Sequence, residues 1–227
     1  ALKSGNAVIL KGGKEALNSN RVLAGLVRKT LIASNSAPED SVSLVESRDE
    51  VAELVKMSAE LDLIIPRGSN ELVQHIQKNA QVPVLGHADG ICHVFLDETA
   101  NEAKSLEVTL DSKLDYPAVC NASETLLVHQ NFSDKLLADI LQKLQDAGVE
   151  LRVCAETEKR LQNFPQLKLK SAAEEDWKTE YIDLILAVKS VKSAEAAVQH
   201  INHYGSKHTD SIVTENAELA EWFMNTV

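Results

Sequence analysis

The chain has 227 residues, of which 44% are hydrophobic and 25% charged, a length and composition typical of one large or two modest globular domains. The 34 acidic residues outnumber the 23 basic ones and give a formal net charge of −11. A surface of this sign repels phosphate backbones and excludes general nucleic-acid binding. No apolar run approaches the roughly 20 residues that a membrane helix needs, and no signal-peptide pattern opens the chain. We therefore expect neither nucleic acid nor a membrane as a partner.

The first part of the chain alternates short apolar runs with helical patterns. Residues 7–10 form an apolar run that enters a Lys-Gly-Gly-Lys turn, and a helical pattern follows over residues 15–33. Ser47 and Glu50 have the spacing of a capping box, which predicts a helix start there. Further strands are predicted at 61–65, 82–85 and 91–95, with a helix after the first of them. This alternation indicates βαβ units and a mostly parallel sheet.

The second part of the chain continues the same alternation. The predicted strands are 125–129, 149–153, 181–191 and 211–213, and the predicted helices are 97–113, 133–147, 194–203 and the segment from residue 217 onward. Residues 171–177 are polar and predict a loop. The whole chain is therefore predicted to be α/β, with a domain boundary near residues 96–98 that separates residues 1–97 from residues 98–227.

Both ends of the chain lack the signals that normally stop an element. Residues 1–6 indicate the frayed end of a helix and a glycine turn, and residues 221–227 stay inside an amphipathic pattern with no Gly or Pro stop. We therefore expect a piece of a longer protein, with missing flexible termini as the alternative.

Three cysteines, Cys92, Cys120 and Cys154, are too few and too scattered for a disulfide framework, and they favour a reducing compartment. Cys120 follows an X-Pro turn and precedes a predicted strand, so we expect it on a loop, where a thiol can serve as a thiolate nucleophile. The alternative is a small buried hydrophobe, the usual role of a free cysteine. Cys92 lies in an alternating strand pattern and is predicted to be buried, and Cys154 is interpreted as structural. No pair of Cys and His residues has the spacing of zinc ligands.

Two turns lie between a predicted strand and a predicted helix, a context in which backbone amides and cations can bind phosphate. One is Lys11-Gly12-Gly13-Lys14 and the other is Pro66-Arg67-Gly68-Ser69, with Ser69 at the expected N-cap. Neither matches the G-x-G-x-x-G fingerprint, and ordinary glycine turns before helices remain the alternative. Two such turns in one parallel sheet favour a ligand, because ligands bind at the carboxyl ends of parallel strands.

Three histidines, His200, His203 and His208, lie close together in the sequence. His200 and His203 are three residues apart on a predicted helix and could share a face, but a solvated helix end is the favoured interpretation. His208 follows a glycine break and precedes Thr-Asp, which makes it the most site-like of the three.

Five segments together resemble one family, the gamma-glutamyl phosphate reductases (glutamate-5-semialdehyde dehydrogenases) of the aldehyde dehydrogenase superfamily. They are SGNAVILKGGKEALNSN (4–20), LDLIIPRGSNELV (61–73), VPVLGHADGICHVFLD (82–97), DYPAVCNASETLLVH (115–129) and VKSAEAAVQHINHYGSKHTDSIVTE (191–215). The resemblance extends to the reductase part of delta-1-pyrroline-5-carboxylate synthase. It implies an aldehyde-dehydrogenase-like α/β fold, with residues 1–97 as a partial Rossmann-like NADP(H)-binding domain and residues 98–227 as the catalytic thiol domain. The family's C-terminal oligomerisation segment would be absent.

The resemblance implies NADPH-dependent reduction of L-glutamyl 5-phosphate to L-glutamate 5-semialdehyde in proline biosynthesis. Cys120 stands at the family's nucleophile position and would form a thioester as phosphate leaves, and NADPH would supply the hydride. Asn121 and the adjacent backbone would contact the oxyanion, and His208 would line the substrate end. The implied cofactor contacts are Lys11, Gly12, Gly13, Lys14, Arg67, Gly68, Ser69 at the pyrophosphate and Glu180 at the nicotinamide ribose.

Two departures from oxidising aldehyde dehydrogenases favour the reductase. Those enzymes place a water-activating Glu where this sequence has Val84, and an enzyme whose thioester must meet hydride needs no such base. NAD-dependent members carry a Glu where this sequence has Lys14, a cation that attracts the 2′-phosphate of NADP(H). An NAD(P)-dependent enzyme that oxidises an aldehyde and a truncated non-catalytic module remain the alternatives.

The same resemblance sets the expected partners and compartment. The substrate would be the small molecule L-glutamyl 5-phosphate, no metal is implied, and a homo-oligomer is expected at full length. The family occurs as a free-standing cytoplasmic enzyme and as a fusion to a glutamate 5-kinase, which is mitochondrial in animals. The segment 174–181 is more typical of the free-standing form, and the kinase fusion stays open as the alternative.

Overall fold

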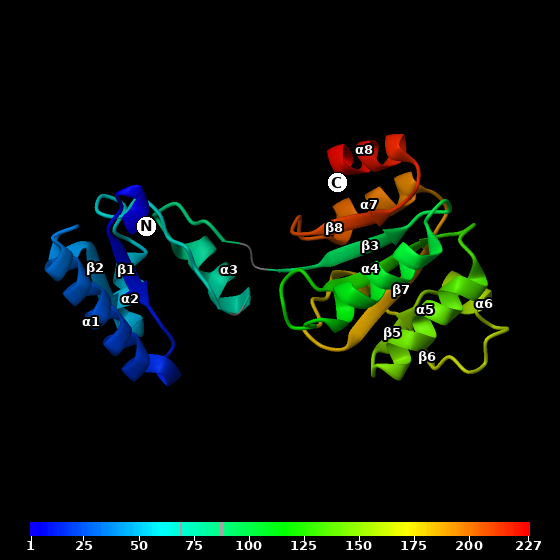
Figure 1. Ribbon diagram of the computed structural model, residues 1–227, viewed down its shortest axis with the longest axis horizontal. Helices are drawn as coiled ribbons and strands as arrows, with labels where there is room; N and C mark the ends of the chain where they lie inside the picture. Colours follow the sequence, from blue (N-terminus) through cyan, green and yellow to red (C-terminus); the bar gives the residue numbers. More distant parts are fainter. Residues whose placement is uncertain (69, 87–88) are drawn as a thin grey trace. The chain divides into compact units, whose positions relative to one another are not determined.

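The computed structural model describes residues 1–68, 70–86 and 89–227, apart from the Asn70 side chain. The chain divides into two compact units, Ala1–Gly86 and His87–Val227, and each has a parallel sheet of its own (Figure 1). Among the described residues, no helix has the length and apolar character required to cross a bilayer.

The first unit is built on two parallel strands, β1 (Val8–Lys11) and β2 (Val42–Val45), with helix α1 (Leu17–Ser34) between them in the chain. Its other elements are the 3-10 turns η1 (Leu2–Ser4), η2 (Lys14–Ala16) and η3 (Glu39–Ser41) and the helices α2 (Arg48–Leu54) and α3 (Asn70–Asn79). At the start of α2, the N–H of Glu50 donates to Oγ of Ser47 and the N–H of Ser47 donates to the Glu50 carboxylate. The predicted capping box is therefore confirmed.

The first unit buries little apolar surface of its own. Among its described residues, the buried apolar side chains are Ala24, Val42, Val55, Pro66, Val73, Ile76 and Val82. Helix α1 exposes Val22, Leu23 and Leu26, whose exposed fractions are 69%, 60% and 60%. The two strands expected at 61–65 and 82–85 are reduced to a single bridge between Ile64 and Val84. Pro66 and Pro83 explain this difference, because proline has no N–H to donate to a longer ladder.

The second unit contains a six-stranded sheet in the order β6-β5-β7-β4-β3-β8, and every pairing in it is parallel. Its strands are β3 (Cys92–Leu96), β4 (Ser123–His129), β5 (Glu150–Val153), β6 (Leu169–Ser171), β7 (Ile185–Val191) and β8 (Asp210–Val213). Its helical segments are α4 (Glu102–Leu114), α5 (Asp134–Asp146), α6 (Ala155–Arg160), the 3-10 turn η4 (Glu174–Lys178), α7 (Ala194–Tyr204) and α8 (Ala217–Thr226). The predicted α/β alternation is confirmed in this unit.

The sheet of the second unit has a hydrophobic core on each face. Successive residues of a strand point to opposite faces, and Val94 and Leu96 of β3 pack with α5 while Phe95 between them packs with α7 and α8. Figure 1 shows α7 and α8 on one side of the sheet and α4 and α5 on the other. A parallel sheet covered on both faces needs nearly continuous apolar strands, which explains the unbroken apolar runs in the sequence.

Several boundaries differ from the sequence-based expectation; helix α4, for example, begins at Glu102 and not at Asp97. Strand β3 pairs with β4 and β8, so the chain divides at Gly86, earlier than the boundary expected near residues 96–98. Strand β7 begins at Ile185 instead of Tyr181, because Ile182 has a φ of 55° that a strand cannot contain. The segment 171–177, expected to be a loop, includes the end of β6 and most of η4.

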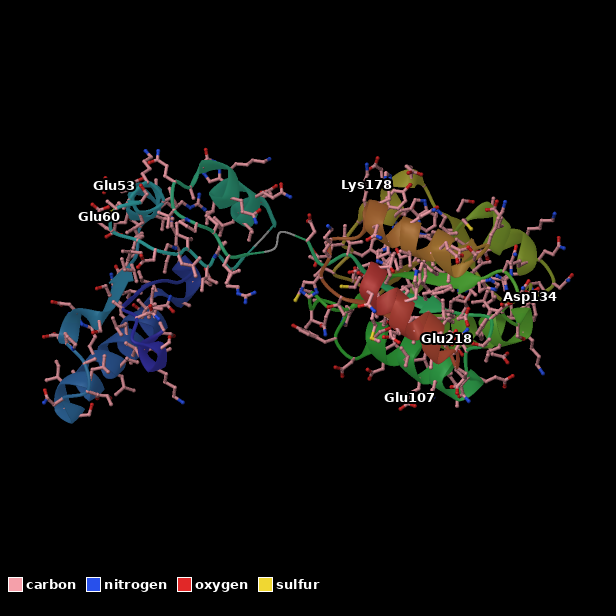
Figure 2. All side chains as sticks on the ribbon, turned by 90° about the horizontal axis from the view of Figure 1, so that it is seen from above. Glu53, Glu60, Glu107, Asp134, Lys178 and Glu218 are labelled. Atoms are coloured by element: carbon pink, nitrogen blue, oxygen red, sulfur yellow. The ribbon has the colours of Figure 1, made fainter. Side chains whose placement is uncertain are left out.

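Acidic side chains lie on the surface of both units. Figure 2 labels Glu53 and Glu60 in the first unit and Glu107, Asp134 and Glu218 in the second, and all five are exposed. The net charge of −11 is therefore carried largely by the surface.

Candidate active site

Four segments of the second unit meet at the amino edge of its sheet. Gly90 precedes β3, Cys120 precedes β4, Glu180 precedes β7 and His208 precedes β8. These strands are neighbours in the order β7-β4-β3-β8 and run parallel, so the segments that precede them gather at one edge. We call this group of segments the amino-edge site.

Cys120 is exposed in the turn between α4 and β4. Backbone hydrogen bonds hold the turn on both sides of it, from the N–H of Val119 to the oxygen of Tyr116 (3.2 Å) and from the N–H of Ala122 to the oxygen of Val119 (3.0 Å). Asn121 is also exposed. The predicted loop position of Cys120 is therefore confirmed, and the alternative of a small buried hydrophobe is wrong.

Gly90 brings the backbone of Cys120 and the carboxylate of Glu180 close together. A Cβ atom on residue 90 would lie 2.3 Å from the carbonyl oxygen of Cys120 and 2.6 Å from Oε1 of Glu180. The φ angle of Gly90 lies outside the left-handed region, so the lack of space, and not the backbone conformation, requires glycine here. Cys120 and Glu180 thus approach the same glycine although they are far apart in the chain.

Cys92 lies directly behind Cys120, with 2% of its surface exposed, so the predicted burial of Cys92 is confirmed. Its Sγ donates to the carbonyl oxygen of Cys120 at 3.2 Å and lies 3.8 Å from Nδ1 of His208. Burial raises the pKa of the Cys92 thiol to about 12, and the nearby Asp210 carboxylate adds to the rise. Cys92 is therefore a neutral thiol at physiological pH.

The segment His208-Thr209-Asp210 lies at the same edge of the sheet, at the start of β8. Nδ1 of the half-buried His208 lies 2.8 Å from Oγ1 of Thr209. Oδ1 of Asp210 lies 2.8 Å from Nδ1 of the fully buried His93 and accepts the backbone N–H of His93 at 3.2 Å. The contacts of Asp210 with His93 link the start of β8 to β3. They hold His208, two residues earlier, beside Cys92.

The other two histidines of the predicted cluster lie elsewhere. His203 is exposed. His200 is only 5% exposed and packs edge-on against Trp177 with ring centroids 5.5 Å apart. Nζ of Lys189 lies 3.1 Å from its Nδ1, and burial, with this ammonium, lowers the pKa of His200 to about 3. The interpretation of His200 as part of a solvated helix end is therefore wrong, because the helix turns this side chain into the core.

A buried ion pair supports the amino-edge site from within. Nζ of Lys113 lies 2.7 Å from Oε2 of Glu124, and the two side chains are 0% and 1% exposed. Oε1 of Glu124 accepts the backbone N–H of Ile182 at 3.3 Å, two residues after Glu180. Burial raises the pKa of Glu124 to about 6, although Lys113 opposes the rise. The pair therefore links the helix before Cys120 to the segment that carries Glu180.

Sequence reasoning missed Gly90, Lys113 and Glu124. The one available signal was Glu124, a charged residue at the start of the mostly apolar segment 123–129. A carboxylate buried there would need a charged or hydrogen-bonding partner. Nothing in the sequence alone could show that Gly90 faces Cys120, since that contact depends on the order of the strands.

The predicted phosphate-binding turns lie in the first unit. Lys11 and Lys14 are exposed, and Nζ of Lys11 donates to the oxygen of Gly12 at 2.6 Å. A Cβ atom on Gly12 or Gly13 would meet only the ends of the Asn20 and Glu15 side chains. In the second turn Arg67 is exposed and Gly68 has a φ of 147° that favours glycine. The prediction for Ser69 falls outside the described residues.

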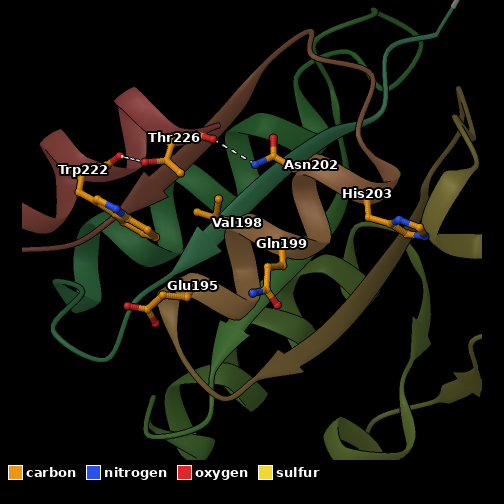
Figure 3. A pocket seen from close by; sticks show the side chains of 7 residues that line it. All are labelled: Glu195, Val198, Gln199, Asn202, His203, Trp222 and Thr226. Carbon is orange, nitrogen blue, oxygen red and sulfur yellow. Dashed lines mark hydrogen bonds between the residues drawn. The ribbon is translucent and has the colours of Figure 1, made fainter.

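A groove of about 560 Å³ lies between α7 and α8, as Figure 3 shows. Its lining residues are Glu195, Val198, Gln199, Asn202, His203, Trp222 and Thr226. The helices are tied there by a hydrogen bond of 3.0 Å from Asn202 to the oxygen of Thr226. None of these residues belongs to the amino-edge site, so the candidate site is identified by its chemistry and not by this groove.

An exposed cysteine near a glutamate, at the edge of a doubly covered parallel sheet, defines an α/β protein with a candidate thiol site. The model of the aldehyde dehydrogenase family matches residues 1–162, and the chain belongs to this family. Over all 227 residues it is 51% identical to gamma-glutamyl phosphate reductase 1 of Synechocystis sp., of which it covers 51%. The chain thus spans about half the length of the curated relatives it matches.

Solved structures agree with this assignment. A gamma-glutamyl phosphate reductase from Thermotoga maritima matches 100% of the chain with a TM-score of 0.93 and 40% identity, and the chain covers 54% of it. A glyceraldehyde-3-phosphate dehydrogenase from Methanocaldococcus jannaschii, complexed with NADP, matches 98% of the chain with a TM-score of 0.69 and 16% identity, and 56% of it is covered. At 16% identity, the match to the Methanocaldococcus jannaschii enzyme shows only that the fold is shared. The resemblance and the fold class found in the sequence are both confirmed.

Proposed function

We propose that the protein reduces L-glutamyl 5-phosphate to L-glutamate 5-semialdehyde with NADPH, through a thioester on Cys120. The observation that carries the proposal is an exposed Cys120 in a chain that is 51% identical, along its whole length, to a protein named gamma-glutamyl phosphate reductase 1. In this proposal the first unit binds the cofactor and the second unit carries the chemistry.

The proposed reaction divides one difficult acyl reduction into two steps. The Cys120 thiolate attacks the acyl carbon, the bond from carbon to the phosphate oxygen breaks, and phosphate leaves with the electron pair, which leaves a thioester on Sγ. When bound, NADPH would supply the hydride that reduces this acyl group. The C–S bond then breaks and the thiolate returns to Cys120. Each addition places negative charge on the acyl oxygen, which the N–H of Asn121 would stabilise.

The amino-edge site supports Cys120 as the reacting thiol. Cys92, the second sulfur there, is buried and stays protonated because its pKa is raised to about 12. The exposed Cys120 is therefore the thiol that a substrate can reach. His208, half-buried on the neighbouring segment, would line the substrate end.

The first unit fits a phosphate-bearing cofactor. Gly13 has φ and ψ of −65° and 155°, which any residue can adopt, and a ligand could reach its backbone once the flexible end of the Glu15 side chain moves aside. Helix α1 begins after Ala16 without a side-chain cap, but the N–H of Leu17 donates to the oxygen of Lys14, so the exposed lysines, and not this helix end, would attract an anion. Lys14 would hold the 2′-phosphate of NADPH and Lys11 the ribose, with Gly12, Arg67 and Gly68 as further contacts. Glu180, in the second unit, would hold the nicotinamide ribose.

An assay of both reaction directions tests the proposal against the oxidising alternative. The assay needs a protein of the relatives' full length, because the chain spans about half of theirs. We expect oxidation of NADPH that depends on gamma-glutamyl phosphate and releases phosphate. Phosphate-independent oxidation of aldehydes with NAD⁺, and no reaction with gamma-glutamyl phosphate, would instead identify an oxidising aldehyde dehydrogenase. Val84, half-buried in a bridge with Ile64, offers no carboxylate for that hydrolytic route.

A further inference from the structure

The segment that carries Glu180 contains a strained residue. Ile182 has a φ of 55°, in the left-handed region, where a β-branched side chain is a genuine outlier. Its side chain is 52% exposed, so the packing of that side chain offsets little of the strain. Such conformations cost free energy and persist only where surrounding contacts fix them, often at functional sites. A contact on the backbone of Ile182 must therefore compensate the strain.

Glu124 supplies this contact. Its Oε1 accepts the backbone N–H of Ile182 at 3.3 Å, and its Oε2 lies 2.7 Å from Nζ of Lys113. The side chains of Glu124 and Lys113 are both buried, so the carboxylate is held from inside the second unit. One carboxylate thus joins a buried ammonium group to the strained residue.

An irregularity in β4 aims Glu124 at this contact. Cys92 pairs with Ser123, and the next residue of β3, His93, pairs with Thr125. Glu124 is therefore an extra residue in β4. A bulge of this kind re-aims a side chain and is found next to functional sites. The bulge, and not the regular pleat of the strand, thus sets the direction of the Glu124 side chain.

The residue that directly follows Glu180 is held as well. The hydroxyl of Tyr181 donates to Oδ1 of Asp176 at 2.8 Å, and Nη1 of Arg152 donates to the same oxygen at 2.7 Å. The turn after Glu180 is therefore fixed at two successive residues. Its carboxylate faces Gly90, because a Cβ atom on residue 90 would lie 2.6 Å from Oε1 of Glu180.

We propose that Glu124 is a positioning residue for cofactor binding: by holding Ile182 in the left-handed conformation, its carboxylate keeps Glu180 aimed at the nicotinamide ribose. This inference rests on the proposed function, in which Glu180 holds that ribose, and deepens it. Glu124 is buried and acts through the backbone of Ile182, and Lys113 keeps the accepting carboxylate in place.

Two substitutions of Ile182 test the backbone conformation. Ile182→Pro removes the N–H that Glu124 accepts and cannot adopt a positive φ, whereas Ile182→Gly keeps the N–H and adopts a positive φ without strain. Binding is measured in the full-length protein with NADPH and with adenosine 2′,5′-bisphosphate, which lacks the nicotinamide ribose. We expect Ile182→Pro to weaken NADPH binding about 10-fold and bisphosphate binding less than about 2-fold. Ile182→Gly should change either affinity less than about 2-fold.

Two paired substitutions test Glu124 itself without leaving an unpaired buried charge, which would endanger folding. Lys113→Met with Glu124→Gln removes both charges but keeps an oxygen that can accept the N–H of Ile182. Lys113→Met with Glu124→Leu removes this oxygen too. We expect the second pair to bind NADPH about 10-fold more weakly than the first, and both pairs to bind the bisphosphate equally.

A double-mutant cycle shows whether the effect passes through Glu180. Glu180→Gln alone should weaken NADPH binding about 10-fold, and adding Ile182→Pro to it should weaken binding further by less than about 2-fold. Additive losses, equal NADPH affinity in the two Glu124 pairs, or an equal loss for the bisphosphate would overturn the positioning role and leave the proposed function standing. Unchanged NADPH binding in Glu180→Gln would instead refute the proposed ribose contact, and the positioning role with it.

Discussion

The two units place their candidate sites at opposite ends of parallel strands. In the first unit, Lys11 is the last residue of β1 and Gly12 and Gly13 follow it, at the carboxyl end of the strand, the usual place for a ligand in an α/β fold. In the second unit, Cys120 and Glu180 precede the amino ends of β4 and β7. The first site lies within one short stretch of sequence, while the second depends on four segments that only the strand order brings together.

The units also differ in the size of their hydrophobic cores, and therefore in how rigidly each can position the residues of a site. The second unit packs both faces of its sheet, and residues such as Leu126 and Leu127 are completely buried. In the first unit α1 leaves Val22 and Leu23 mostly exposed. A rigid, covered sheet can fix a reacting thiol, whereas an exposed turn of glycines and lysines suits the binding of a charged ligand.

Removing the proposed nucleophile should produce the largest effect. In the full-length protein, Cys120→Ser should lower the NADPH-dependent reduction of gamma-glutamyl phosphate by about 1,000-fold or more, because a weaker nucleophile replaces the thiolate. Cys154→Ser is the control and should retain activity. Turnover by Cys120→Ser close to that of the parent would break the assignment of chemistry to the second unit.

Breaking the buried ion pair should have the next largest effect. Lys113→Met leaves the Glu124 carboxylate buried without its partner and should lower the free energy of unfolding by about 3–5 kcal/mol. The matched control is Lys104→Met, which breaks an exposed pair with Glu215 and should cost less than about 1 kcal/mol. Urea unfolding is followed by tryptophan fluorescence, which reports on the second unit alone because Trp177 and Trp222, the two tryptophans, both belong to it. Similar losses in both variants would contradict the account.

The buried His200 should make the second unit less stable in mild acid. Its pKa is lowered to about 3, whereas a histidine in the unfolded chain titrates near pH 6.5. Below that pH the unfolded chain binds a proton that the native His200 excludes, so the free energy of unfolding falls by up to about 1.4 kcal/mol per pH unit. Between pH 7 and pH 5 this histidine should account for a loss of about 2 kcal/mol.

A pair of variants checks this dependence on pH. His200→Gln should remove that part of the loss, and the exposed His203→Gln should not. The measurement is urea unfolding at both pH values. An unchanged pH dependence in His200→Gln would show that the native side chain does bind a proton in this range.

The smallest expected effect concerns the proposed cofactor-binding turn of the first unit, Lys11–Lys14. Lys14 is exposed, so solvent screens its charge. In the full-length protein Lys14→Gln should weaken NADPH binding about 10-fold, or about 1.4 kcal/mol, and leave NADH binding unchanged. Fluorescence titration with both cofactors measures this, and Lys3→Gln serves as a control at an exposed position of the same unit. An equal loss for both cofactors would place Lys14 away from the 2′-phosphate.

Local features of the sequence predicted much of this molecule. The alternating pattern predicted the parallel α/β fold, Ser47 and Glu50 predicted a capping box, and the X-Pro turn predicted the loop position of Cys120. These features depend on neighbours in the chain, and local propensity therefore suffices. The resemblance to a known family supplied the roles of Cys120 and Glu180, which no local pattern indicates.

What the sequence could not show depends on tertiary packing. Gly90 is an ordinary glycine until the strand order places the Cys120 carbonyl against it. His200 was interpreted as part of a solvated helix end, but Trp177 and Lys189 contact it in the fold. The boundary of the units was misplaced because membership of β3 is decided by its partners β4 and β8.

Trapping the covalent intermediate tests the central claim most directly. The full-length protein is mixed with gamma-glutamyl phosphate in the absence of NADPH, quenched in acid and digested, and the peptides are analysed by mass spectrometry. The account predicts a glutamyl adduct on the peptide that contains Cys120, and its loss when NADPH is added. An unmodified Cys120, in a protein that nevertheless oxidises NADPH with this substrate, would contradict the account.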